Sequence, residues 1–291
     1  MCAKKTHEEG QVPTTGHSWD GIEEYDNPMP RWWVWIFYAC IVWGVGYTIA
    51  YPSWPMLTQA WQGVIGTKAI DTLNKDIASW DAHNAVVQEK LVNVDLNEIQ
   101  NDPELVAFAN NAGRAIFMNN CAQCHGAGAA GVQNLGYPNL LDDDWLWGGD
   151  MEAIHYTVTH GIRNTGSDEA RFSQMPRFGL DGMLEKAQIA EVAEYVLKIS
   201  GQEHDAALAN AGEMIFADNC SACHGETGLG DREQGAPNLT DAVWLYGGSR
   251  EAIIESVTEA RFGVMPNWSP RLSEADIRAV AFYVHGLGGG E

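Results

Sequence analysis

An uncharged apolar run lies near the start of the chain, and its length predicts a membrane-spanning helix. Residues 32–51, WWVWIFYACIVWGVGYTIAY, contain no Asp, Glu, Lys or Arg over twenty positions. As an α-helix this run would span about 30 Å, the thickness of a bilayer's hydrocarbon core. Trp32, Trp33 and Trp54 lie at its ends, where aromatic rings favour the membrane interface. Core helices are usually shorter, and a cleaved signal would carry a small-residue cleavage site, so we expect a retained anchor.

Beyond the anchor the pattern becomes that of helices with one apolar face. Between residues 70 and 94 the apolar positions recur at steps of three and four, with one larger gap, which predicts an amphipathic helix. NDPEL then predicts the start of a further helix, because Asp102 can cap it and Pro103 suits its first position. Residues 52–104 are therefore expected to form a linker that contains helix.

The rest of the chain contains the same pattern twice, at an offset of ninety-nine residues. The matched segments are NAGRAIFMNNCAQCHG (111–126) with NAGEMIFADNCSACHG (210–225), PNL (138–140) with PNL (237–239), and WLWGG (145–149) with WLYGG (244–248). Each copy predicts a first helix, a glycine-rich loop, a short helix, a second loop and a final helix. We expect an all-α protein with two small domains, residues 105–201 and 205–291.

Each copy carries the motif C-x-x-C-H at the end of its first helix. The motif residues are Cys121, Cys124 and His125 in the first copy, and Cys220, Cys223 and His224 in the second. A disulfide or a zinc site of four thiolates would not require the histidine, and no βαβ pattern supports a thioredoxin-like switch. C-x-x-C-H is the attachment signal for haem c, in which two thioethers fix the porphyrin and the histidine binds the iron. The sequence predicts two covalently bound haem c groups.

The sixth ligand of each iron separates an electron carrier from a ligand-binding haem. Each copy has a Met-Pro pair after its short helix, Met175-Pro176 and Met265-Pro266. A Met thioether keeps the iron six-coordinate and raises its potential, as in electron-carrying cytochromes. We therefore predict Met175 as ligand of the first haem and Met265 as ligand of the second. The first copy has an insertion, HGIRNTGSD, at residues 160–168.

Two histidines of the first copy could compete with methionine. His155 and His160 have no counterparts in the second copy, so we expect them to be surface or packing residues.

The distribution of charged residues predicts on which side of the membrane each segment lies and which class of partner the chain could bind. The 291 residues include 39 Asp and Glu against 17 Lys and Arg, a net charge of -22. This charge argues against binding to nucleic acid. It suits either a cationic partner or a role in solubility alone. Lys4, Lys5 and Arg31 precede the anchor and no further cation occurs until Lys68, so the positive-inside rule places residues 1–31 in the cytoplasm. Haem c attachment takes place outside the bacterial inner membrane, which also makes the haem domains periplasmic.

The repeats resemble class I cytochrome c domains over residues 105–289. In that family a glycine and an aromatic residue of the first helix meet an aromatic residue of the last helix. The resemblance implies these contacts: Gly113 and Phe117 with Tyr195, and Gly212 and Phe216 with Tyr283.

The segment before the anchor resembles one particular family. WDGIEE (19–24) and NPMPRWW (27–33) are similar to the lead-in of the dihaem subunit of cbb3-type cytochrome c oxidases. This resemblance implies that electrons arrive from a c-type cytochrome and leave through a monohaem c-type subunit to the haem b–copper catalytic subunit. That subunit reduces oxygen to water and pumps protons, and this chain would be non-catalytic. A free-standing anchored dihaem carrier for another dehydrogenase or reductase, and a dihaem peroxidase, remain as alternatives.

Overall fold

The computed structural model describes residues 12–66, 68–133 and 135–291. Lys4 and Lys5, which entered the orientation argument, lie outside these residues. The chain separates into two compact units, with the boundary between His83 and Asn84. The strands and helices are β1 (Thr14–Trp19), β2 (Ile22–Tyr25), α1 (Arg31–Ala50), α2 (Ala69–Asn93), η1 (Leu96–Asn101), α3 (Pro103–Ile116), η2 (Phe117–Cys121), α4 (Ala122–His125), α5 (Met151–His160), α6 (Lys186–Ile199), α7 (Ala206–Asn219), α8 (Ser221–His224), α9 (Arg250–Glu259) and α10 (Glu274–His285).

The first unit begins with a β-hairpin, which the sequence analysis did not predict. Strands β1 and β2 pair antiparallel, with Trp19 opposite Ile22. Asp20 and Gly21 form the turn, and both have positive φ angles, 50° and 85°. Asp-Gly is a preferred pair for such two-residue turns, so the sequence did contain the signal for this hairpin.

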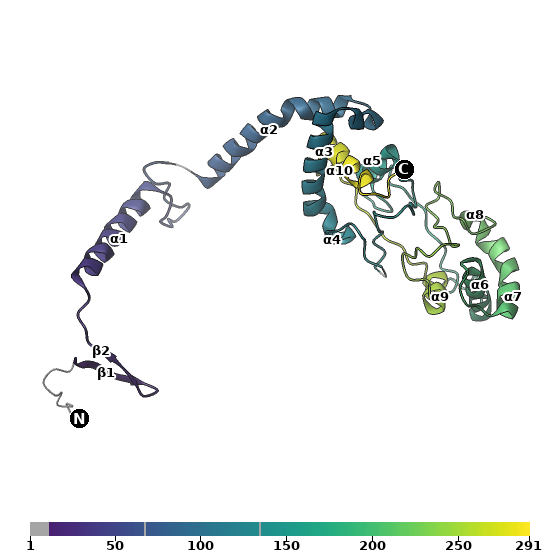
Figure 1. The fold of residues 1–291 in the computed structure, drawn as a ribbon, viewed down its shortest axis with the longest axis horizontal. Coiled ribbons are helices and arrows are strands. Elements are labelled where there is room, and N and C mark those ends of the chain that lie inside the picture. The colour runs from purple at the N-terminus through teal and green to yellow at the C-terminus, as the bar shows by residue number, and fades with distance from the viewer. Residues whose placement is uncertain (1–11, 67, 134) are drawn as a thin grey trace. The chain divides into compact units, whose positions relative to one another are not determined.

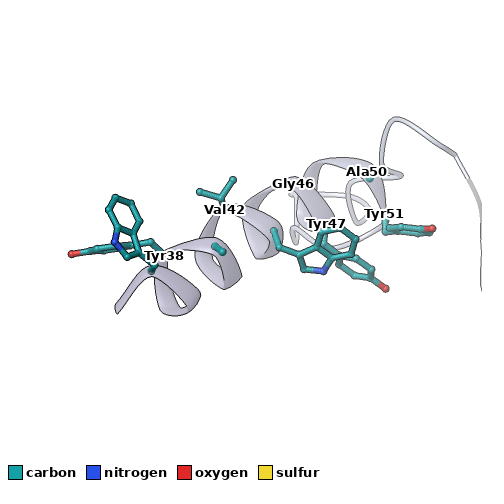
Figure 2. Close-up of a pocket in the computed structure, with 9 residues that line it drawn as sticks. Tyr38, Val42, Gly46, Tyr47, Ala50 and Tyr51 are labelled. Carbon is teal, nitrogen blue, oxygen red and sulfur yellow. The ribbon is translucent and has the colours of Figure 1, made fainter. Parts of the chain in front are cut away.

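Helix α1 confirms the predicted apolar helix, one residue earlier than expected. It covers Arg31–Ala50 and is long and apolar enough to cross a membrane. None of its residues is buried against the rest of the chain. Along one side, Gly46 and Ala50 leave a shallow groove between larger side chains such as Tyr38 and Tyr47 (Figure 2). A helix that is apolar all round and uncovered by its own chain suits a lipid environment.

The second unit begins within α2 and contains both sequence repeats. Leu91 of α2 is fully buried there. The predicted cap of the next helix is confirmed, because the Asp102 carboxylate accepts hydrogen bonds from the backbone N–H groups of Glu104 (2.9 Å) and Leu105 (3.5 Å). Pro103 occupies the first turn of α3 as expected.

The two repeats do not form one core each. Instead, α3 of the first repeat packs along α10 of the second, and α6 of the first packs along α7 of the second (Figure 1). The short helices follow the same rule, since α5 packs on α10 and α9 packs on α6. We call residues 84–160 and 265–291 lobe 1, and residues 175–260 lobe 2. Each lobe has its own buried hydrophobic cluster.

The helix contacts expected from the class I resemblance are therefore wrong in their pairing. Phe117 lies against Tyr283, with ring centroids 5.7 Å apart, and Phe216 lies against Tyr195 at 5.1 Å. A Cβ on Gly113 would overlap the Ala279 carbonyl oxygen of α10, so the glycine does permit a close helix crossing, but with the other repeat. The glycine and aromatic residues that make these helix contacts were predicted correctly, but each first helix contacts the last helix of the other repeat.

The link between α6 and α7 gives a physical reason for the exchange. Only residues 200–205 separate the two helices, and short connections place consecutive helices side by side as an antiparallel hairpin. Buried Glu194 of α6 strengthens this arrangement. Its carboxylate accepts the Asp205 backbone N–H at 2.7 Å and pairs with Arg250 of α9.

Candidate haem sites

The first C-x-x-C-H motif lies on a tight helical turn that follows α3. Cys121 and Cys124 are free thiols in this structure, and His125 ends α4. The Nδ1 atom of His125 lies 3.1 Å from the Pro138 carbonyl oxygen, a geometry in which Nδ1–H donates and Nε2 keeps its lone pair. Burial lowers the pKa of His125, which favours the neutral imidazole that binds iron. This hydrogen bond also fixes the ring's orientation, as is usual for metal-binding histidines.

The second motif reproduces this geometry. Cys220 follows α7, Cys223 lies within α8, and both are free thiols. The Nδ1 atom of His224 lies 3.0 Å from the Pro237 carbonyl oxygen, and burial lowers its pKa as well. The two predicted motifs are thus equivalent in structure as well as in sequence.

The first cysteine of each motif is held as a neutral thiol. Burial, together with the nearby thiol of Cys124, raises the pKa of Cys121 to about 11. Burial and the neighbouring Cys223 raise the pKa of Cys220 to about 11 in the same way. A thiol with a raised pKa is a poor free nucleophile, because the thiolate is the nucleophilic form.

The loop after each histidine sets the position of the proline carbonyl. The N–H of Gly131 donates to the His125 carbonyl at 2.8 Å, and Gly230 does the same to His224 at 2.8 Å. A Cβ on Gly131 would overlap the Tyr137 carbonyl, so the loop closes on itself only with glycine there.

The two predicted methionine ligands lie in different lobes. Met265 packs against the lobe 1 cluster, which includes Cys121 among its partly buried members. Met175 packs against the lobe 2 cluster, which includes buried Cys220. Each methionine thus packs in the lobe that contains the histidine motif of the other repeat, whereas the sequence analysis had paired them within a repeat.

Two buried polar atoms supply a test of whether the two repeats suit a haem. Among the described residues, Trp147 Nε1 and Tyr246 Oη are buried without a hydrogen-bond partner. They occupy matching positions in the two repeats, in WLWGG and WLYGG. Orphaned buried donors are rare, and two at equivalent positions indicate that an external acceptor belongs there. The carboxylates that a haem carries are acceptors of that kind.

Cationic side chains accompany these two donors. Arg171 lies over the Trp147 ring at 5.4 Å, and Arg261 lies over the Tyr246 ring at 5.0 Å. These arginines match one another in the repeated EARF segments. Free thiols, a histidine with a fixed ring, a thioether and these donors and cations are residue types that fit a covalently bound haem.

The competing histidines are engaged elsewhere. His155 Nε2 lies 3.0 Å from Glu274 Oε1, and His160 contacts Ser167 and Glu169 at 3.2 Å. Within the described ranges no three His, Cys, Asp or Glu side chains are gathered in a way that could hold a metal ion. The expectation that these two histidines are surface or packing residues is in keeping with these contacts.

The sequence analysis missed the role of the insertion. Within it, the backbones of Ile162 and Met265 exchange two hydrogen bonds, of 2.9 and 3.0 Å, and the Asn164 side chain donates to the Met265 carbonyl at 3.1 Å. These residues position a methionine of the other repeat. The signal available beforehand was the polar composition of the insertion, which indicated only a loop.

Comparison with known proteins covers the chain from its lead-in to its last helix. The family model described as the N-terminal domain of cytochrome oxidase-cbb3, FixP, matches residues 11–58. A cytochrome c model matches residues 111–200, and the model for cytochrome c oxidase, cbb3-type, subunit III matches residues 207–284.

Curated relatives match over the full length. The chain is 64% identical over 292 residues to the cbb3-type cytochrome c oxidase subunit CcoP of Cereibacter sphaeroides, covering 100% of both chains. It is 53% identical to CcoP of Rhodobacter capsulatus, covering 99% of this chain and 100% of that one. It is 47% identical to the FixP subunit of Sinorhizobium medicae, covering 100% of both. The two cytochrome c domains carry two covalently bound haem c groups, and α1 anchors the protein in the membrane. The chain belongs to the CcoP/FixP family, subunit III of cbb3-type cytochrome c oxidases.

Proposed function

We propose that this chain relays electrons from a c-type cytochrome donor toward the catalytic subunit of a cbb3-type oxidase. The observation that carries the proposal is the pair of equivalent C-x-x-C-H sites, each in a lobe whose cluster one methionine joins. When bound, each haem supplies a reversible one-electron Fe(III)/Fe(II) couple, and a thioether ligand raises its potential. The residues proposed to hold the two groups are Cys121, Cys124, His125, Cys220, Cys223, His224, Met175 and Met265.

The protein is a subunit of an oxidoreductase complex, and we propose that it does no bond chemistry itself. A histidine and a methionine in each lobe would fill both axial positions, which leaves no iron face for oxygen or peroxide. A CO difference spectrum of the isolated reduced subunit tests this point. The expected result is negligible CO binding by the native protein, whereas stoichiometric binding would favour the dihaem peroxidase.

The proposed partners are the monohaem c-type subunit, the haem b–copper catalytic subunit and a basic c-type cytochrome donor. Residues 110–291 contain 25 acidic and 11 basic residues, a net charge of -14, which would steer a basic donor toward this part of the chain, and such steering weakens as salt screens the charges. The family match over residues 11–58 disfavours a free-standing carrier, because that segment is the family's own lead-in.

Purification in mild detergent tests membership of the assembly. An affinity-tagged chain is compared with a variant that lacks the hairpin residues 14–25. We expect the large catalytic subunit to purify with the intact chain. Two haems per chain with no accompanying oxidase subunit would instead support the free-standing carrier.

We propose that residues 1–31 lie in the cytoplasm and that the haem-bearing part lies in the periplasm. Arg31 is the first residue of α1, and Lys68 is the next Lys or Arg along the chain. A periplasm-active phosphatase fused after Glu291 should be active, whereas the same enzyme fused before the hairpin should be inactive. The reverse pattern would contradict this orientation.

As sequence repeats, residues 105–201 and 205–291 remain the proposed haem-binding modules.

A further inference from the structure

We propose that the loop after α1 is seated in the interfacial layer of the lipid bilayer, at the end of the membrane span. This loop, residues 52–65, is called the cap loop below. Its ligand is the phospholipid surface, the layer in which headgroups meet acyl chains. The proposal rests on α1 being the membrane anchor, and it does not depend on which side of the membrane the haem domains occupy.

The cap loop is bonded to the last turn of α1. The last four carbonyl groups of a helix have no partner within it, apart from the bond that closes its final turn. In α1 the Tyr47 carbonyl accepts the Tyr51 N–H at 2.9 Å. The other three accept hydrogen bonds from the cap loop: Thr48 from Ser53 Oγ at 2.7 Å, Ile49 from the Val64 N–H at 3.0 Å, and Ala50 from the Ile65 N–H at 3.1 Å.

This pairing indicates the medium in which the end of α1 lies. In water, carbonyl groups at a helix end can bond to solvent, so they need no partner from the protein. In lipid no such partner exists, and each unpaired group is costly. Trp61 adds a further donor, because its Nε1 lies 3.3 Å from the Ile49 carbonyl oxygen. The cap loop therefore gives α1 the completed end that a helix needs when it stops below the aqueous phase.

The cap loop is apolar and uncharged on its outer side. Residues 32–67 contain no Asp, Glu, Lys or Arg, so the uncharged run continues well beyond α1. Loops that face water are usually polar, and contiguous exposed apolar surface marks a binding or membrane site. Tryptophan also favours the membrane interface. The exposed apolar side chains of the cap loop are Trp54, Met56, Leu57, Trp61, Val64 and Ile65.

Continuity with α1 identifies lipid as the occupant. The hydrogen bonds place the cap loop beside the end of α1 (Figure 1). No residue of α1 is buried by the chain, so the medium that surrounds its last turn also meets the cap loop. That medium is the bilayer, which is apolar on one side of the interface and polar on the other. Charge returns at Lys68, whose ammonium group suits the headgroup layer where the chain leaves the membrane.

Gly63 allows the loop to approach the helix. Its φ angle is 75°, and a Cβ at this position would overlap the Ala50 carbonyl. Gly66 has a similar φ angle of 67°, but a Cβ there would meet nothing within 4 Å. Gly63→Ala should therefore move the cap loop away from α1. Gly66→Ala introduces the same kind of backbone strain without the overlap, which makes it the matched control.

Thiol accessibility in a bilayer tests the proposal. The full haem-loaded chain is placed in phosphatidylcholine nanodiscs, with Cys2→Ala and Cys40→Ala, while haem c occupies the other four cysteines. Single thiols are introduced by Leu57→Cys in the cap loop and by Leu180→Cys in lobe 2. Both leucines are exposed in the chain, so the protein itself shields neither position. The probe is a charged maleimide that does not enter lipid.

We expect the thiol of Leu57→Cys to react about tenfold more slowly than that of Leu180→Cys. The probe is excluded from the apolar layer, and a rise of one unit in the thiol pKa alone lowers the thiolate fraction about tenfold. After unfolding in SDS the two rates should be equal. Equal rates in nanodiscs, or a difference that persists in SDS, would overturn the proposal.

The chain without other oxidase subunits distinguishes lipid from protein as the covering partner. A photoactivatable phosphatidylcholine in the same nanodiscs should form adducts within residues 52–67, identified by mass spectrometry of the peptides. Adducts confined to α1 would contradict the proposal. Protection of Leu57→Cys that appears only in the purified oxidase would mean that another subunit covers the loop, which would also overturn it.

The glycine variants test whether the bond to α1 holds the loop in the membrane. In the Leu57→Cys chain, Gly63→Ala should raise the labelling rate toward that of Leu180→Cys, and Gly66→Ala should leave the rate low. Haem content is measured alongside as a control for the haem domains. Equal labelling rates of the two glycine variants would refute the role of the contact with Ala50.

Discussion

The ring of Phe117, the first residue of η2, lies 5.7 Å from the ring of Tyr283 on α10, with an interplanar angle of 54°. Tilted aromatic pairs at this distance are favourable contacts in protein cores. The two residues belong to different repeats, and their counterparts Phe216 and Tyr195 form the same kind of pair. Each lobe therefore depends on helices from both halves of the chain, and we expect the two haem sites to fold as one cooperative system.

The helix crossing at Gly113 should not tolerate a methyl group. Gly113→Ala would place its Cβ on the Ala279 carbonyl and against the Tyr283 side chain, so we expect a loss of about 1–3 kcal/mol in the free energy of unfolding. Urea unfolding followed by circular dichroism measures this loss. Gly128→Ala is the control, because a Cβ there meets nothing within 4 Å. Equal stability of the two variants would argue against the α3–α10 contact.

The buried carboxylate of Glu194 should stabilise lobe 2 at neutral pH. Its hydrogen bonds with Arg250 lower the pKa of Glu194, so its stabilising effect is present above the ordinary glutamate pKa of about 4.3. The effect disappears as the pH falls through the lowered value in the folded state. Glu194→Gln should cost about 1–3 kcal/mol at pH 7.

The pH dependence separates this effect from a general loss of packing. We expect the stability difference between Glu194→Gln and the native chain to shrink as the pH falls below about 4, measured by urea unfolding over a pH series. Glu226→Gln, at an exposed loop position, should show little change at any pH. A difference that stays constant with pH would count against the ion pair as its source.

Asp144 should have the opposite effect on stability. Burial, with added repulsion from Asp241 and Asp142, raises the pKa of Asp144 to about 6, while Arg232 partly offsets the repulsion. The folded state therefore favours the protonated acid, and stability should rise as the pH falls from about 6 toward the ordinary aspartate pKa of about 3.9. Asp144→Asn imitates the protonated form, and we expect it to gain on the order of 1 kcal/mol at pH 7 after allowance for solvent screening.

The gain from Asp144→Asn should close as the pH approaches about 4, where the native side chain is protonated in the folded state and close to its ordinary pKa in the unfolded chain. Thermal unfolding at several pH values gives the comparison. Asp168→Asn, on the exposed insertion, is the control. A destabilised Asp144→Asn variant at pH 7 would show that the carboxylate is held favourably.

Replacing Trp147 should affect the stability of the chain differently in the presence and in the absence of haem. In the chain without haem its buried Nε1 has no partner among the described residues, so Trp147→Phe should not reduce stability through loss of a hydrogen bond. In the haem-loaded protein, loss of a donor to a haem carboxylate should shift a midpoint potential and lower stability. Redox titration and unfolding of Tyr246→Phe should show the same contrast. Identical effects with and without haem would contradict the donor role.

The local elements could be predicted because short-range chemistry determines them. Asp102 and Pro103 specify the start of α3, and the uncharged run specifies α1, through interactions within a few residues. The same holds for the two C-x-x-C-H turns, where the hydrogen bond from His125 to Pro138 repeats between His224 and Pro237.

The exchange could not be predicted from the helices themselves. The repeats are so similar that the apolar face of α3 suits α6 as well as α10, and sequence periodicity does not distinguish them. The short connection of residues 200–205 favours the observed pairing, because short links usually place consecutive helices side by side. The role of Asn164 was missed for a related reason, since its partner, the Met265 carbonyl, lies 101 residues away in the other repeat.

The central claim is that two haem groups are bonded covalently to this chain, one at each C-x-x-C-H motif. Intact mass spectrometry of the protein purified from its native membrane, followed by identification of the modified peptides, tests it most directly. We predict the mass of the polypeptide plus two haems, with one haem on the peptide that contains Cys121 and Cys124 and one on the peptide that contains Cys220 and Cys223. An unmodified chain, or one whose four cysteines hold only a metal ion, would contradict the account.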